Sequence, residues 1–271
     1  MVSLASPRVA DLPVIRKSPS QRCRQVDLLP KTRLAEREPV ARRIRPVVSA
    51  DVSRVAESLL AGREFVPAEG NRSALYQGAK RTMDVAGALV LLAVLAPVMA
   101  TIYAVLYITT GGRPIFCQTR VGHRGRPFTM YKFRTMRHDA EQIKNQIDNE
   151  QTGPVFKNRR DPRITTIGRL LRKTSLDETP QLFNVLLGEM ALVGPRPPIA
   201  REVAEYKPWQ RRRLAVKPGL TCLWQVSGRC EVGFEDWVRL DIWYVTNQTL
   251  WTDLNLLLRT PISVITGRGA Y

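Results

Sequence analysis

An uninterrupted apolar run, from Val85 to Thr110, constrains this chain more than any other feature of its sequence. The run holds about 26 residues without a charge, and as a straight helix it would extend nearly ~40 Å, more than the roughly 30 Å of a bilayer's hydrocarbon core. A soluble core helix rarely stays apolar on every face over this length. The run therefore predicts insertion into a membrane and argues against a plain nucleic-acid-binding protein.

Both flanks of the apolar run are basic. Lys80 and Arg81 precede it, and it is followed by Arg113, Arg120, Arg124 and Arg126. Because positive charge favours the cytoplasmic side, both ends are expected on the same face of the membrane. Pro97, near the middle, removes a helix hydrogen bond and favours a kink. These residues leave two readings open: a helix that enters, bends and returns, or an ordinary span that tolerates a proline.

The composition of the rest of the chain suits anionic partners. Its net charge of +18 fits a membrane surface or phosphorylated substrates as well as nucleic acid. Residues 1–74 are rich in Arg and Pro with little periodicity, which predicts a largely disordered or loosely helical extension. Four cysteines without zinc-like spacing and two histidines indicate a reduced, cytoplasm-facing chain without a structural metal.

Local patterns predict an α+β fold that is mostly helical. Two arms, Pro114–Thr119 and Pro127–Met136, flank a turn-rich segment and predict a small β-hairpin. A turn and a short basic helix are expected in DPRITTIGRLLRK, and extended structure from Pro218 onward. Longer helices are expected at Ser175–Leu187, Phe234–Thr246 and Leu250–Ile265.

The candidate catalytic residues are the adjacent acids Asp177 and Glu178 in SLDETPQLFNVLLG. A structural reading is available, since Ser175 and Glu178 have the spacing of a capping box at a helix start. Basic residues lie upstream in sequence: Arg169, Arg172 and Lys173. Arg196, held between prolines in GPRPP, adds a stiff two-pronged phosphate ligand. Carboxylates among such cations can attack phosphorus or hold Mg²⁺ against phosphate oxygens.

Several motifs occur in order along the chain: KRTMD, PIFCQTRVGHRGRPFTMYKFRTM, DPRITTIGRLLRKTSLDETPQLFNVLLGEMALVGPRPP and KPGLTCLWQVSGR. In this series the chain, from Lys80 to its C-terminus, closely resembles the bacterial sugar transferase family, the monotopic polyprenyl-phosphate phosphoglycosyl transferases. The terminal ITGRGAY is similar to members that start exopolysaccharide or capsule synthesis. Two positions depart from the family motifs: Ala96 stands before Pro97 in place of serine, and Cys222 stands in place of glycine.

The resemblance implies a two-step reaction that initiates exopolysaccharide, capsule or O-antigen synthesis. Asp177 would attack the diphosphate of a UDP-sugar, with a hexose such as glucose or galactose favoured, releasing UMP and keeping the sugar phosphate on its carboxylate. Undecaprenyl phosphate would then accept the sugar phosphate. Glu178 would assist with Mg²⁺ and proton handling, so the metal would lie at Asp177 and Glu178. The alternatives are a UDP-N-acetylated sugar as donor, or a basic membrane scaffold without catalysis.

The resemblance also implies which cations bind the substrate phosphates: Lys132, Arg172, Arg196 and Arg229. Each could instead be a surface or structural cation, and Arg211–Arg213 reads as a solvated face. The implied architecture is a monotopic membrane protein, with an N-terminal extension (1–74), a re-entrant helix region kinked at Pro97 (75–110) and a catalytic domain (111–271).

The expected location is the bacterial inner membrane, with the catalytic domain on its cytoplasmic face. Anionic inner-membrane lipids are expected partners and nucleic acid is not, while the oligomeric state, self-association included, stays open. The late helices carry aromatic residues suited either to the headgroup level of a membrane or to a packed core: Trp237, Trp243, Tyr244 and Trp251.

Overall fold

One long helix, α2 (Ala74–Thr109), contains nearly all of the apolar run. The computed structural model describes residues 73–143, 147–150, 154–156, 158, 160–226 and 233–266, so the predicted basic extension lies almost entirely outside the described residues. Ser73 caps the helix by accepting a hydrogen bond from the Tyr76 N–H. Within the described residues, α2 alone is long and apolar enough to cross a membrane, and most of its apolar surface is exposed.

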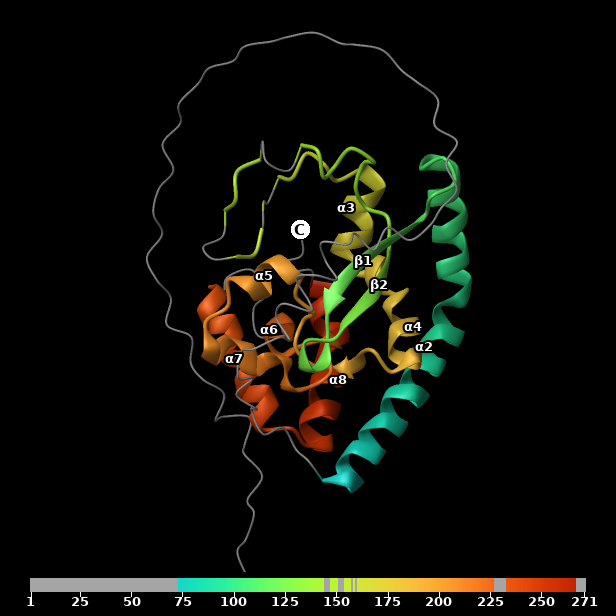
Figure 1. Ribbon diagram of the computed structural model, residues 1–271. Coiled ribbons are helices and arrows are strands. Elements are labelled where there is room, and N and C mark those ends of the chain that lie inside the picture. The colour runs from blue at the N-terminus through green and yellow to red at the C-terminus, as the bar shows by residue number, and fades with distance from the viewer. Residues whose placement is uncertain are drawn as a thin grey trace, which may run out of the picture. The chain divides into compact units, whose positions relative to one another are not determined.

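Figure 1 shows α2 running along one side of the molecule, with α4 (Gln181–Leu187) beside it. Pro97 lies inside the helix, which continues past it to Thr109. The Pro97 carbonyl accepts a hydrogen bond from the Thr101 hydroxyl at 2.9 Å. The apolar, mostly exposed helix agrees with the prediction of a membrane segment, whereas the re-entrant path stays a prediction.

The basic residues before the apolar run have partners within the fold. Lys80 is buried and its Nζ lies 3.0 Å from Oδ2 of Asp253, on a distant helix. The Arg81 guanidinium donates to the carbonyl oxygens of Val185 (2.7 Å) and Leu186 (2.8 Å), which lie at the unsatisfied end of α4. These two cations therefore dock the start of α2 on the rest of the chain, and do not stand as free charges beside a membrane.

The far end of α2 packs against the same body. Leu106 is buried in a cluster with Phe133 and Leu171. Beyond the helix, a ring nitrogen of His138 lies 2.9 Å from the Thr110 carbonyl oxygen. Contacts at both ends of the helix are thus with other parts of the same compact unit, residues 48–271.

The predicted hairpin is confirmed. Strands β1 (Ile115–Val121) and β2 (Pro127–Phe133) pair antiparallel, from Ile115 opposite Phe133 to Val121 opposite Pro127. A short turn, η2 (His123–Gly125), joins them. The basic amphipathic helix is also confirmed as α3 (Thr166–Lys173), which begins at the Thr165 cap.

The structure contains a second sheet, for which the sequence predicted only extended structure from Pro218 and no pairing partner. β3 (Ala191–Val193) and β4 (Gly219–Thr221) form a parallel pair, so the extended prediction from Pro218 holds only as far as Thr221. The helix α6 (Leu223–Val226) follows directly. Gly194 and Gly219 approach so closely that a Cβ on Gly219 would clash with the Gly194 backbone. This contact holds the Gly-Pro-Arg-Pro-Pro loop against β4.

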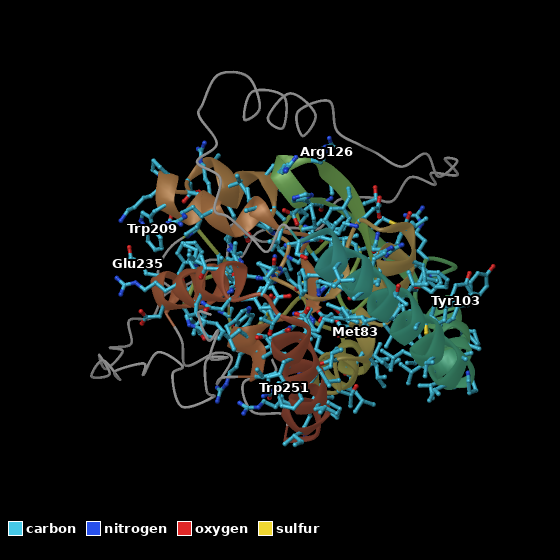
Figure 2. The ribbon with its side chains drawn as sticks, turned by 90° about the horizontal axis from the view of Figure 1, so that it is seen from below. Met83, Tyr103, Arg126, Trp209, Glu235 and Trp251 are labelled. Carbon is cyan, nitrogen blue, oxygen red and sulfur yellow. The ribbon has the colours of Figure 1, made fainter. Side chains whose placement is uncertain are left out.

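The remaining described helices close the domain: α5 (Ala200–Ala204), η5 (Pro208–Ala215), α7 (Phe234–Thr246) and α8 (Leu250–Thr266). The predictions for α7 and α8 are confirmed. Trp237 and Tyr244 are buried in the core, so the interfacial reading is wrong for them. Trp251 is 65% exposed on α8, and Figure 2 shows it at the outer edge of the molecule, as the interfacial reading requires.

Candidate active site

The segment that carries the two acids is not one helix. Ser175 has a left-handed backbone (φ 56°) and separates α3 from a short turn, η4 (Leu176–Glu178), after which α4 begins at Gln181. The prediction of a continuous helix over Ser175–Leu187 is therefore wrong at its start. The Ser175 side chain makes no capping bond, so the capping-box reading of Ser175 and Glu178 is also excluded.

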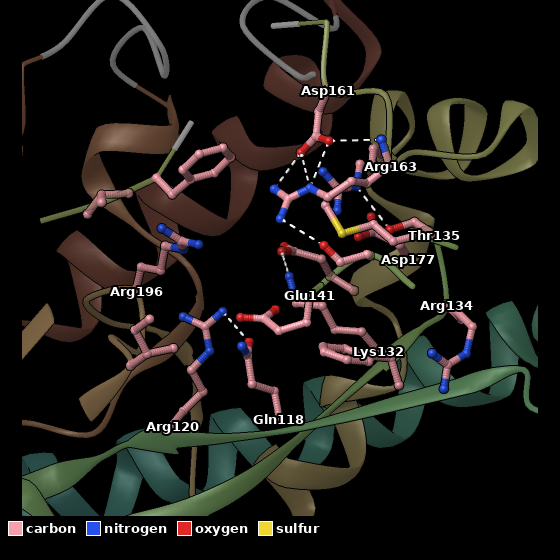
Figure 3. Close-up of a pocket in the computed structure, with 18 of the residues that line it drawn as sticks. Gln118, Arg120, Lys132, Arg134, Thr135, Glu141, Asp161, Arg163, Asp177 and Arg196 are labelled. Atoms are coloured by element: carbon pink, nitrogen blue, oxygen red, sulfur yellow. Dashed lines mark hydrogen bonds and ion pairs between the residues drawn. The ribbon is translucent and has the colours of Figure 1, made fainter. Parts of the chain in front are cut away.

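The left-handed turn at Ser175 precedes Asp177, whose buried side chain lines a cavity. A non-glycine residue in this conformation is costly and often marks a functional site. Asp177 is only 6% exposed and lines a cavity of about 440 Å³. The walls of this cavity come from the hairpin, the α3–η4 turn and the Gly-Pro-Arg-Pro-Pro loop. Figure 3 shows Arg120 and Arg196 on one side of the cavity and Asp177 and Lys132 on the other.

Opposing interactions set the pKa of Asp177. Burial raises its pKa to about 6, while Lys132 and Arg172 act in the opposite direction and the Glu178 carboxylate adds to the increase. A carboxylate of this kind is ionised at neutral pH yet poorly solvated. It is therefore more available as a nucleophile than a water-exposed aspartate.

The cations predicted to bind phosphate gather around the acids. Nζ of Lys132, on β2, lies 2.6 Å from Oε1 of Glu178. Arg172 Nε donates to the Thr135 hydroxyl at 3.0 Å, and burial lowers the pKa of Arg172 while the Asp177 carboxylate opposes that change. Each of these side chains is held by a specific partner, which limits its motion at the cavity wall.

Arg196 lies in the same cavity, with its guanidinium 5.5 Å from the ring centroid of Trp237. The structure thus brings three of the predicted phosphate ligands together with the acids: Lys132, Arg172 and Arg196. The fourth, Arg229, lies outside the described residues. The roles of these residues in phosphate binding stay predictions.

Sequence reasoning missed Arg120, which was taken only as a basic flank of the apolar run. It is buried in the cavity wall, where Nη1 donates to the Pro197 carbonyl (2.9 Å) and Nη2 to the Gln118 side chain (2.6 Å). Burial, and then the neighbouring Arg196, lower its pKa to about 10. The alternation of the hairpin arm was the available signal, because Gln118 and Arg120 share one face of β1.

Arg213 was also misread, as part of a solvated face. It is 1% exposed and pairs with Asp241 at 2.5 Å, and burial raises the pKa of Asp241 to about 6 although Arg213 opposes the increase. Arg213 also donates to the Tyr206 hydroxyl (2.8 Å) and to the Arg196 carbonyl (3.2 Å). The buried pair therefore anchors the backbone that presents Arg196 to the cavity.

Cys222, which replaces a family glycine, fits without strain. It is buried, its backbone is not left-handed, and its N–H and S–H both donate to Oε1 of Gln225, at 3.0 and 3.1 Å. The loop therefore does not depend here on the backbone freedom of glycine.

Within the described part of the chain, no three His, Cys, Asp or Glu side chains gather as a ready-made metal site. Mg²⁺ usually binds through one or two carboxylates and completes its shell with substrate phosphates and water. Asp177 and Glu178 offer hard oxygen donors beside a cavity lined by Lys132, Arg172 and Arg196. These residues fit an ion that arrives with a diphosphate better than one held by protein alone.

Comparison with known proteins places the chain among related sequences. The sequence profile described as bacterial sugar transferase matches residues 75–267. The galactosyl transferase CpsE of Streptococcus agalactiae is 48% identical over 196 residues, which cover 71% of this chain and 43% of CpsE. The undecaprenyl-phosphate galactose phosphotransferase of Salmonella typhimurium is 44% identical over 199 residues, covering 71% of this chain and 41% of that protein.

The chain thus spans less than half the length of these two relatives. It matches a shorter one nearly from end to end: the exopolysaccharide production protein ExoY of Rhizobium meliloti, 37% identical over 214 residues that cover 76% of this chain and 95% of ExoY. The matched profile covers nearly all of the long apolar helix, the hairpin, both acids and the three described cations. The chain therefore belongs to the bacterial sugar transferase family.

Proposed function

We propose that this protein transfers a sugar-1-phosphate from a UDP-sugar, with UDP-galactose or UDP-glucose favoured, to undecaprenyl phosphate and releases UMP. The observation that carries the proposal is a buried carboxylate, Asp177, facing a cation-lined cavity in a chain of this family. The names of two relatives, a galactosyl transferase and an undecaprenyl-phosphate galactose phosphotransferase, support the substrates. The relative named for exopolysaccharide production supports a role in initiating such polymers.

The donor diphosphate is held by arginines. Arg120 and Arg196 face the cavity opposite Asp177, and each is fixed by backbone or aromatic contacts. Guanidinium groups suit phosphate because their planar donors match its oxygens in pairs. Fixed cations of this kind neutralise charge that develops on the phosphate oxygens without reorganising during the reaction.

In the first step, a carboxylate oxygen of Asp177 attacks the sugar-bearing phosphorus. A new oxygen–phosphorus bond forms, the bridging bond of the diphosphate breaks, and UMP leaves with the bonding electron pair. Lys132 and Arg172, which line the same cavity as the acids, stabilise the charge on the phosphoryl oxygens. Lys132 also holds Glu178 in place through the 2.6 Å contact.

In the second step, a phosphate oxygen of undecaprenyl phosphate attacks the same phosphorus. The bond to Asp177 breaks, its carboxylate is regenerated, and the diphosphate-linked lipid sugar leaves; a dianionic acceptor needs to lose no proton. Mg²⁺, when bound at Asp177 and Glu178 with the substrate, supplies further neutralisation of phosphate charge.

We also propose that α2 is re-entrant and that residues 111–271 form a catalytic domain on the cytoplasmic face of a bacterial inner membrane. The contacts at the two ends of α2 support this arrangement. Lys80 near its start and Leu106 near its end both pack on the same polar domain, which an ordinary span would have to divide between two compartments. The basic residues 1–74 are expected to bind anionic lipids through their charge.

The chemistry is tested by a half-reaction without the lipid acceptor. Incubation of purified protein with Mg²⁺ and UDP-galactose should release UMP in an amount equal to the enzyme, and undecaprenyl phosphate should then allow turnover. Asp177→Asn should release none while staying membrane-bound. Asp236→Asn, a control on α7 outside the cavity, should behave as the unmodified protein. Undiminished UMP release by Asp177→Asn would overturn the assignment of the nucleophile.

A panel of donors then tests the substrate. Fastest UMP release from UDP-galactose or UDP-glucose supports a hexose, whereas fastest release from UDP-N-acetylgalactosamine moves the assignment to an N-acetylated sugar. No release from any UDP-sugar, with the protein folded and Mg²⁺ present, would favour a scaffold without catalysis.

The path of α2 is tested by labelling. In a cysteine-free background, Gly78→Cys and Arg113→Cys place thiols just before and just after the apolar run, and a Cβ at Gly78 meets no neighbouring atom. An impermeant maleimide should label both from the cytoplasmic side of oriented vesicles. Labelling from opposite sides would restore an ordinary span.

A further inference from the structure

Among the residues that the structure describes, two buried hydrogen-bond donors near the candidate nucleophile have no acceptor. They are Nε of Arg120 and Nε2 of Gln181, the first residue of α4. Gln181 is 3% exposed and Arg120 is 8% exposed, so bulk water does not satisfy either group. Buried donors are almost always paired, because leaving one unpaired costs free energy. Two such donors in one place therefore indicate a site suited to a ligand atom that accepts hydrogen bonds.

Both donors line the same small recess. It has a volume of about 20 Å³, close to the space that one water-sized group occupies. The recess shares part of its wall with the main cavity, since five residues line both: Arg120, Lys132, Glu178, Arg196 and Gln225. A group bound in the main cavity can therefore extend one oxygen atom into the recess.

The charge around the recess favours an anionic oxygen. Arg120, Lys132 and Arg196 contribute three positive charges, and Glu178 contributes one negative charge that Lys132 already contacts at 2.6 Å. The two terminal nitrogens of Arg120 donate to the Pro197 carbonyl and the Gln118 side chain, which fixes the guanidinium. Its Nε is left without an acceptor within the described part of the chain. An oxygen that carries partial negative charge would accept hydrogen bonds from Arg120 Nε and Gln181 Nε2, and it would offset this excess of positive charge.

We infer that this recess is an oxygen-binding hole that receives one nonbridging oxygen of the sugar-bearing phosphate, with Gln181 as a catalytic hydrogen-bond donor beside Arg120. The inference rests on the proposed function, since it specifies how that reaction's phosphate is held. Gln181 moves no proton: its amide donates a hydrogen bond while Asp177 attacks the phosphorus. Negative charge builds up on the nonbridging oxygens in such a transfer, so a fixed donor there stabilises the transition state.

The first test separates catalysis from folding. Gln181→Met keeps the volume of the side chain and removes the donor. UMP release in a single turnover should fall by about 100-fold or more, as for loss of one oxyanion-hole donor, while the melting temperature without substrate stays equal or rises because an unsatisfied donor has been removed. A lower melting temperature together with unchanged UMP release would overturn the inference.

A matched control is available in Gln210, which is also buried but whose side-chain oxygen accepts the Lys207 N–H at 2.8 Å. Gln210→Met should show the opposite pattern, a lower melting temperature with UMP release unchanged. If both glutamine variants lose stability alike and neither loses activity, Gln181 is a structural residue only.

The second test probes the size of the recess. In two UDP-sugar diastereomers, a sulfur replaces one or the other nonbridging oxygen of the sugar-bearing phosphate. Sulfur is larger than oxygen and a weaker acceptor, so the unmodified protein should react much more slowly with the diastereomer that directs sulfur into the recess. Gln181→Ala, which enlarges the recess, should reduce this discrimination.

The outcomes separate this inference from the proposed function. Equal rates for the two diastereomers with the unmodified protein, or equal discrimination after Gln181→Ala, would show that the recess holds only water and would overturn the inference. The proposed function fails instead if the unmodified protein releases no UMP from any oxygen-containing UDP-sugar.

Discussion

The charge on Asp177 should cost the protein stability, and removing it should recover that stability. A carboxyl group whose pKa is raised by folding binds its proton more tightly in the folded chain than in the unfolded one. Between the two pKa values, the unfolded chain is ionised while the folded chain still holds the proton. The contribution of Asp177 to the free energy of unfolding is therefore fully present below its unfolded-state pKa, and it is lost as the pH rises through its folded-state pKa.

The size of the effect follows from the pKa of Asp177, which rises from 3.8 to about 6 in the folded chain. Each pKa unit corresponds to about 1.36 kcal/mol. The ionised Asp177 carboxylate therefore lowers the free energy of unfolding at neutral pH by about 3 kcal/mol. Asn has nearly the same shape and no charge. Asp177→Asn should therefore melt about 6–12 °C higher at pH 7.5, at about 2–4 °C per kcal/mol for a domain of this size.

Thermal unfolding of both proteins from pH 4 to pH 8, in the same detergent and without divalent cations, measures the difference. The advantage of Asp177→Asn should be largest above pH 7 and should shrink towards zero as the pH falls to 4. Asp236→Asn, which lies outside the cavity, should show no comparable gain. Equal melting temperatures at pH 7.5, or an advantage that does not shrink in acid, would refute this account of Asp177.

The other predictions concern the groups around Asp177. Lys132→Met should shift the rising limb of the pH profile of UMP release to higher pH, because Lys132 lowers the pKa of Asp177; an unshifted profile would contradict the coupling. Arg213→Leu leaves Asp241 buried and unpaired and should cost about 3–5 kcal/mol of stability, whereas the double variant Arg213→Leu with Asp241→Leu should recover much of it; chemical denaturation measures both, and a double variant no better than the single one would count against the pair. Gly219→Ala should abolish UMP release before it unfolds the chain, because its Cβ would displace the loop that carries the site arginine; a fully active variant would show that this close approach is not required.

Elements with a strong local pattern could be predicted from the sequence. The hairpin follows from alternation around a turn, and α7 and α8 follow from helical periodicity. The start of α4 could not be predicted in this way. A left-handed Ser175 divides that segment, and tertiary contacts override the local signal of a capping box.

The buried cations show a second limit of local reasoning. The sequence predicted surface or membrane-flanking positions for three cations: Lys80, Arg120 and Arg213. A residue's charge can be seen in the sequence, but the distant partner that permits its burial cannot. Their partners lie far along the chain: Asp253 for Lys80, the Pro197 carbonyl for Arg120 and Asp241 for Arg213. A buried cation is tolerable only with such a partner, so its location is decided by the fold.

The sequence by itself determined the long apolar helix, the pair of acids and the ordered motifs that identify the family, because each is a local pattern of residue types. Only the tertiary structure decided that Asp177 is buried with a raised pKa and that Arg120 belongs to the site. It also decided that a recess lined by Glu178 holds two donors for which the described residues offer no acceptor. The physical reason is that burial, electrostatic coupling and hydrogen-bond satisfaction depend on side chains brought together from distant segments.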